Sequence, residues 1–126
     1  MRTPLRAVLA TASLGVLAAC GGGSSTPAET LPADVGLLVR AVPSLRFDAE
    51  SYTARAGEVL VGYSNEDTVR HTLIIAKGDT KVPNFRLVIE KKGSVDSGTV
   101  TLEAGTYTLI CDVPGHSNMR ATLTVG

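Results

Sequence analysis

Short runs of apolar residues alternate with polar ones from about residue 37 to the C-terminus. Alternation with a period of two is typical of half-buried β-strands. The clearest runs cover residues 37–42, 59–64, 71–76, 85–90, 106–111 and 120–125, with shorter ones at 45–47, 52–56 and 100–102. Turn residues such as Gly, Asn, Asp and Pro separate them. The pattern predicts an all-β domain, an antiparallel Greek-key sandwich or barrel of about seven or eight strands. Residues 78–84 fit either a loop or a helical turn.

The first twenty residues follow a different pattern. Arg2 and Arg6 precede an apolar stretch at residues 7–17, which is shorter than the roughly 20 residues of a membrane-spanning helix. This arrangement is typical of a secretory signal peptide. Residues 17–20, Leu-Ala-Ala-Cys, resemble the lipobox of bacterial lipoproteins, in which cleavage precedes a lipid-modified cysteine. We expect a signal peptide at residues 1–19 and lipid attachment at Cys20. The alternative is an ordinary signal peptide that happens to contain a cysteine.

Residues 20–35 are rich in Gly, Ser, Thr and Pro and have no apolar period. This composition is typical of a flexible tether, so we place the folded domain at residues 36–126. We expect export by the general secretory route, because the signal lacks an Arg-Arg pair. The domain would then lie in the cell envelope, anchored to the membrane by lipid and facing the periplasm or the cell exterior.

The overall composition excludes several functions. The chain has 12 basic and 12 acidic residues, 4% aromatic residues and no Trp. A nucleic-acid-binding protein usually has a basic face or aromatic platforms for bases, so we expect no nucleic-acid partner. No phosphate-binding loop is visible, and a Ser-His-Asp triad would need one of the two histidines. We therefore expect that the protein is not an enzyme.

The most informative residues are the second cysteine, both histidines and the second methionine. Cys111, His116 and Met119 lie within nine residues of one another, and His71 begins a different predicted strand. With Cys20 assigned to lipid, Cys111 is unpaired, which suggests a reactive group, a partner disulfide or a metal ligand. Two imidazoles, a thiolate and a weak axial thioether form the ligand set of a blue copper site. Zinc is an alternative for Cys and two His, although structural zinc sites usually use closely spaced ligand pairs.

At these residues the sequence resembles the cupredoxins, the small blue copper proteins of the plastocyanin and azurin type. The resemblance covers residues 37–126. It is carried by the segment 63–71 that ends in the first histidine, the strand 105–111 that ends in the cysteine, the Pro-Gly-His at 114–116, and the closing strand 119–125. It implies a cupredoxin fold with one type 1 copper ion held by His71, Cys111, His116 and Met119.

Three positions depart from the family pattern. The spacing between His116 and Met119 is shorter than usual in the family, which implies an altered axial distance for Met119. Thr72 stands where many members have an Asn that ties the two ligand loops together, and Ala121 stands where a Gly is usual. We expect Thr72, together with Asn65 in the preceding turn, to hold the ligands in place without binding the metal themselves.

The resemblance implies a one-electron carrier that exchanges electrons with a partner protein such as a cytochrome, an oxidase or a reductase. We expect a monomer. A copper-binding module for storage, delivery or tolerance, without redox turnover, is the alternative. A domain of a multicopper oxidase would need extra His pairs, which this chain lacks.

Overall fold

Residues 29–126 are described by a computed structural model of the protein, and strands form all of their regular secondary structure. The predicted signal peptide and Cys20 lie outside these residues. No helix in the described part is long and apolar enough to span a membrane. The ten strands are β1 (Leu37–Val42), β2 (Arg46–Phe47), β3 (Ser51–Ala54), β4 (Gly57–Asn65), β5 (His71–Lys77), β6 (Thr80–Lys81), β7 (Leu87–Ile89), β8 (Val95–Leu102), β9 (Gly105–Ile110) and β10 (Arg120–Val125).

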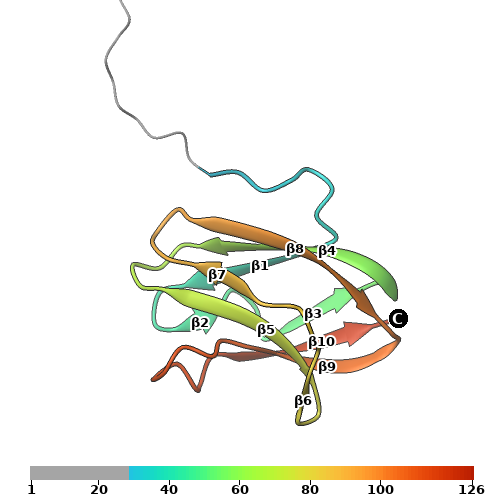
Figure 1. Ribbon diagram of the computed structural model, residues 1–126. Coiled ribbons are helices and arrows are strands. Elements are labelled where there is room, and N and C mark those ends of the chain that lie inside the picture. The colour runs from blue at the N-terminus through green and yellow to red at the C-terminus, as the bar shows by residue number, and fades with distance from the viewer. Residues whose placement is uncertain (1–28) are drawn as a thin grey trace, which may run out of the picture.

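The strands form two sheets that face each other (Figure 1). One sheet has the order β2-β1-β4-β8, and the other has the order β3-β10-β9-β5-β6, with β7 paired to β5. The predicted all-β class is therefore confirmed, with more strands than the seven or eight expected. β6 was not among the predicted runs, and β2 lies within the predicted run at 45–47; each of them has only two residues.

The prediction of a purely antiparallel arrangement was wrong for two pairs. β1 pairs with β4 in parallel, and β10 pairs with β3 in parallel. The alternation of apolar residues indicates which face of a strand is buried, but it carries no information on the direction of the neighbouring strand. Both sheets are consequently mixed.

The central part of the chain also differs from expectation. β8 begins at Val95, several residues before the predicted run at 100–102, because its first half is polar and half-buried. The segment 78–84, expected as a loop or a helical turn, contains the short strand β6 followed by a loop.

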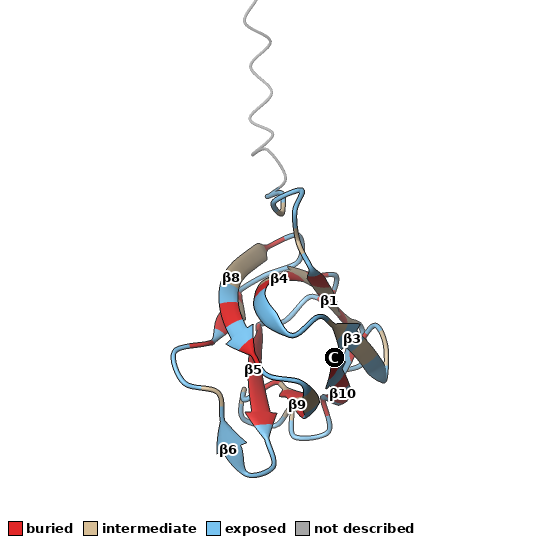
Figure 2. Cartoon of the chain, turned by 90° about the vertical axis from the view of Figure 1, so that its right-hand side faces the viewer, coloured by how far each residue is buried: buried red, intermediate tan, exposed pale blue. Residues whose placement is uncertain are grey.

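The core lies between the two sheets, and Figure 2 shows buried residues in red along strands such as β5. β10 alternates strictly between exposed and buried positions, as a strand with one solvated face should. β5 is buried at its first six residues and has neighbouring strands along both edges: β9 pairs with one edge and β6 with the other, and β7 pairs with its first three residues. The start of β5 is therefore a rigid and dry position.

Residues N-terminal to β1 contact the first sheet. The Glu29 carboxylate accepts a hydrogen bond from the backbone N–H of Val95 at 2.8 Å. A Cβ atom at Gly62 would lie 3.1 Å from side-chain atoms of Leu31 and Val35, so the lack of a side chain at Gly62 leaves room for this segment. These contacts fall within the segment predicted as a tether.

Candidate metal centre

Two loops at the same end of the sandwich bring together residues that are far apart in the sequence. His71 is the first residue of β5, and Cys111 directly follows β9, its antiparallel neighbour. Because Ile74 pairs with Ile110, the start of β5 lies beside the end of β9. Figure 1 shows the loop before β5 and the loop between β9 and β10 at the end of the molecule opposite the C-terminus.

His71, Cys111 and His116 form a compact cluster. One potential ligand atom from each lies within 4.8 Å of the others. The Sγ atom of Cys111 is 4.0 Å from Nδ1 of His71 and 3.5 Å from Nδ1 of His116. The two imidazole rings are 5.0 Å apart at an angle of 47°. Thus the Nδ1 atoms of both rings face the sulfur, as three ligands of a single ion would.

The sulfur of Cys111 is almost completely buried and lies against Thr72. The backbone N–H of Thr72 points to Sγ at 3.4 Å, and its hydroxyl oxygen is 3.6 Å away. That hydroxyl lies closer to the Asp112 carboxylate, at 2.5 Å, so its single proton goes to the carboxylate. The backbone N–H is therefore the group of Thr72 that donates to the sulfur.

Thr72 and Asp112 tie β5 to the loop that follows Cys111. The Thr72 hydroxyl also accepts a hydrogen bond from the backbone N–H of Asp112 at 2.9 Å. Arg86 donates two hydrogen bonds to the Asp112 carboxylate, each at 3.2 Å. Partial burial raises the pKa of Asp112, but the hydrogen bonds from Arg86 and Thr72 outweigh it, and the pKa lies below its usual value. Asp112 is therefore an anionic link between the two loops.

The other nitrogen of His71 contacts an acidic residue that the sequence interpretation missed. Nε2 of His71 lies 2.9 Å from Oδ2 of Asp67, and the imidazole is fully buried. Asp67 lies between the predicted runs 59–64 and 71–76, where an Asp is an ordinary turn residue. The available signal was its position four residues before the first candidate ligand, in a loop that must fold back on that histidine.

Asn65 organises this loop without touching the cluster. Its side chain accepts the N–H of Asp67 at 2.9 Å and donates to the carbonyl of Val69 at 2.8 Å. Asp67 in turn accepts the N–H of Thr68 at 2.7 Å. Burial raises the pKa of Asp67, but the hydrogen bonds from His71 and Thr68 lower it below its usual value. The support from Asn65 therefore reaches the cluster through Asp67.

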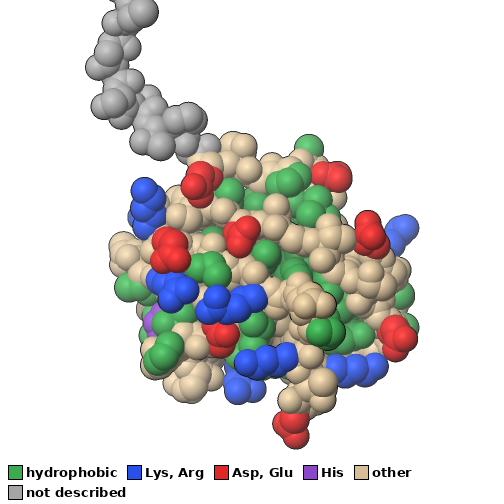
Figure 3. Space-filling view, viewed as in Figure 1, with side chains coloured by type: hydrophobic (Ala, Val, Ile, Leu, Met, Phe, Trp, Pro, Cys, Tyr) green, Lys and Arg blue, Asp and Glu red, His purple; other side chains and the backbone are tan. Residues whose placement is uncertain are grey.

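His116 lies in a tight and more exposed loop. Its N–H bonds to the carbonyl of Val113 at 3.0 Å, and its carbonyl accepts the N–H of Met119 at 2.9 Å. Gly115 has a φ of 89°, a conformation that favours glycine. Burial and the neighbouring His71 lower the pKa of His116. Figure 3 shows histidine at the molecular surface at this end, beside hydrophobic side chains.

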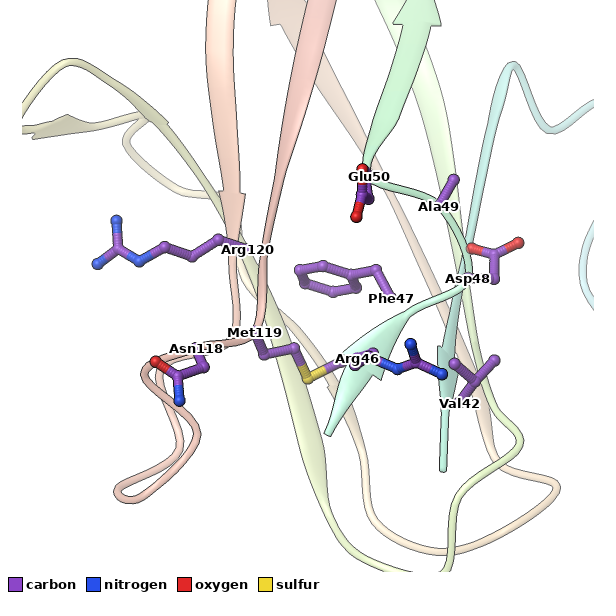
Figure 4. Close-up of a pocket in the computed structure, with 9 residues that line it drawn as sticks. All are labelled: Val42, Arg46, Phe47, Asp48, Ala49, Glu50, Asn118, Met119 and Arg120. Atoms are coloured by element: carbon purple, nitrogen blue, oxygen red, sulfur yellow. The ribbon is translucent and has the colours of Figure 1, made fainter. Parts of the chain in front are cut away.

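Met119 is 1% exposed and belongs to the hydrophobic core. Its carbonyl accepts the N–H of Cys111 at 3.2 Å, so its backbone is joined to that ligand as well as to His116. Figure 4 shows its side chain extending from the start of β10 toward β2. There it lines a pocket of about 370 Å³ together with Arg46 and Phe47, and this pocket does not include the three clustered residues. Axial ligation by Met119 stays a prediction.

Comparison with solved structures identifies the fold. A reduced auracyanin from the photosynthetic bacterium Roseiflexus castenholzii superposes with a TM-score of 0.63 at 18% identity, over 71% of this chain and 95% of that one. An azurin from the methylotroph Methylomonas sp. strain J superposes with a TM-score of 0.59 at 18% identity, over 75% of this chain and 99% of the azurin chain. A reduced amicyanin variant superposes with a TM-score of 0.55 at 21% identity, over 75% of this chain and 86% of the amicyanin chain. The chain has the cupredoxin fold. No family model and no curated protein matches the sequence.

In this cupredoxin fold the donor set fits a soft transition metal. Two imidazoles and one thiolate suit copper better than magnesium or calcium, which prefer oxygen ligands. The cluster is dry on the side of His71 and Cys111, while His116 is partly open to solvent. Cys111 is also the one cysteine in the described residues, and it is free rather than disulfide-bonded. The site can thus hold a single metal ion with one ligand at the surface.

Proposed function

We propose that the protein is a type 1 copper protein that carries one electron at a time between redox partners. The observation that carries this proposal is the convergence of the buried Cys111 sulfur with Nδ1 of His71 and Nδ1 of His116. The cupredoxin fold supports it. Copper, when bound, would supply the Cu(I)/Cu(II) couple.

The residues of the chain have distinct roles in this proposal. Cys111 provides a thiolate that is shielded from water and held by the N–H of Thr72. His71 provides a buried imidazole whose orientation is set by the hydrogen bond between its Nε2 and Asp67. His116 provides the partly exposed imidazole, and therefore the shortest route from the site to a docked partner. Met119 is the proposed axial ligand. A site held so firmly by the sandwich needs little rearrangement when its charge changes.

The proposed location is the outer face of a bacterial membrane, with Cys20 as the lipidated residue. Two or more acyl chains anchor a protein stably, whereas one chain does so only marginally. The partner would be another redox protein of the envelope, such as a cytochrome, and the carrier would act as a monomer without enzymatic activity of its own. Cys20→Ala should release the protein in soluble form or stop its processing. Unchanged membrane attachment in this variant would contradict the proposed anchor.

Copper storage or delivery is the second candidate, and the short spacing between His116 and Met119 favours it. A carrier should be reduced and reoxidised repeatedly by a cytochrome while it retains its copper against a chelator. A storage protein should give its copper to the chelator and turn over poorly. Rapid loss of copper together with failure to cycle would replace the carrier proposal by the storage one.

A further inference from the structure

The carboxylate of Asp67 lies on the far side of His71 from the sulfur. Its Oδ2 atom is 2.9 Å from Nε2 of His71, and the two side chains are 10% and 0% exposed. An ionised carboxylate can only accept a hydrogen bond, so Nε2 of His71 must be the donor. A neutral imidazole with its proton on Nε2 has its lone pair on Nδ1, which is the atom that faces Cys111.

The position of Asp67 is itself determined by neighbouring groups. Its other oxygen accepts the N–H of Thr68, and its own N–H is held by the Asn65 side chain. The backbone of Asn65 is in turn bonded to Ser94 and Gly93, at 2.9 and 2.8 Å. The carboxylate is therefore anchored to the first sheet and to the loop before β8, and it cannot follow His71 if the ring rotates.

We propose that Asp67 is a positioning residue that fixes the tautomer of His71 and lowers the reduction potential of the metal centre. The effect on the reduction potential rests on the proposed copper function. A negative charge against a ligand stabilises the more positively charged, oxidised metal, and a nearly dry surrounding screens this effect little. The carboxylate also makes the imidazole a stronger donor to the metal, which acts in the same direction.

Asp67→Asn is the informative variant because an amide has the same shape without the charge. Thr68 and His71 contact different oxygens of Asp67, and the amide keeps an oxygen at only one of these two positions. Asp79→Asn is the matched control. Asp79 is exposed in the turn after β5, whose first residue is His71. The seven residues of β5 span about 20 Å, which is beyond the Debye length at physiological salt.

The tautomer is measured on the metal-free protein from the ¹⁵N chemical shifts of the His71 ring nitrogens. We expect the proton on Nε2 in the wild-type protein and a weakened preference in Asp67→Asn. The potential is measured on the copper-bound proteins. We expect Asp67→Asn to shift the redox equilibrium toward the reduced state by at least tenfold, about 59 mV for one electron, and Asp79→Asn to leave it unchanged.

A wild-type His71 with its proton on Nδ1 would overturn the positioning role, whatever the variants do. Equal potentials in Asp67→Asn, Asp79→Asn and wild type would overturn the electrostatic role. If the wild-type protein binds no copper, the proposed function and the electrostatic role fail together, and the metal-free tautomer still decides the positioning role.

Discussion

The two histidines of the cluster lie in opposite kinds of surroundings. His71 begins a strand that is buried on both sides, and its outer nitrogen is bonded to Asp67, which Asn65 holds in place. His116 lies in a loop that is largely exposed, and its backbone bonds are made within the same loop or to the adjacent Met119. One histidine belongs to the framework of the protein, and the other belongs to its surface.

This difference shows how a small sandwich can combine rigidity with access. The His71 side provides a fixed geometry that would persist in either charge state of a bound ion. The His116 side leaves the cluster partly open to solvent, which is the access that the proposed function needs. Thr72, Asp112 and Arg86 connect the two sides, because they join β5 to the loop that carries His116.

Loss of the Asn65 side chain should destabilise the protein on the His71 side of the cluster. Asn65→Ala removes its hydrogen bonds to Asp67 and Val69 in a buried site, and we expect a loss of about 2–3 kcal/mol in the free energy of unfolding. The matched variant in the exposed loop, Asn118→Ala, should cost less than about 0.5 kcal/mol. Urea unfolding of the metal-free proteins measures both. Equal losses would show that the two sides do not differ.

Acid should destabilise the metal-free protein in two stages. The pKa of His116 is lowered in the folded state, so the unfolded chain binds more protons below about pH 6.5 and stability falls there first. The pKa values of Asp67 and Asp112 are also lowered. Their stabilisation is present above about pH 4 and is lost as the pH falls through their folded-state values.

The stages of this pH profile are assigned by variants. His116→Gln should remove the upper stage, and Asp67→Asn or Asp112→Asn should flatten the lower one. Free energies of unfolding measured from pH 8 to pH 3 test this. A profile in His116→Gln that matches the wild type would contradict the assignment of the upper stage.

The smallest effect should come from the connection between the two sides. Arg86 is 46% exposed on its side chain, and its ion pair with Asp112 is open to solvent. We expect Arg86→Gln to cost less than about 1 kcal/mol at low salt and almost nothing at high salt. A cost that does not change with salt would mean that Arg86 stabilises the loop by packing rather than by charge.

Most of the candidate site could be predicted from the sequence because its residue types are rare in this chain. Only two histidines and two cysteines are present, and the resemblance to the cupredoxins implied that His71, Cys111 and His116 hold one metal ion. The all-β class followed from the alternation of apolar residues. Alternation along residues 107–111 places Cys111 on the same face as Tyr107 and Leu109, and all three are buried.

The remaining features depended on contacts that alternation does not describe. The two parallel pairs depend on how strands distant in the sequence are arranged. The polar first half of β8 has no apolar period because it is only half-buried. Asp67 was missed because a carboxylate in a turn usually bonds its own backbone, and only the folded loop shows that its second oxygen faces His71.

The most direct test of the account is the absorption spectrum of the protein after addition of Cu(II). The account predicts an intense blue colour from charge transfer between the Cys111 thiolate and copper, and complete loss of this band in Cys111→Ser. A colourless copper complex, or a blue colour that survives in Cys111→Ser, would contradict it.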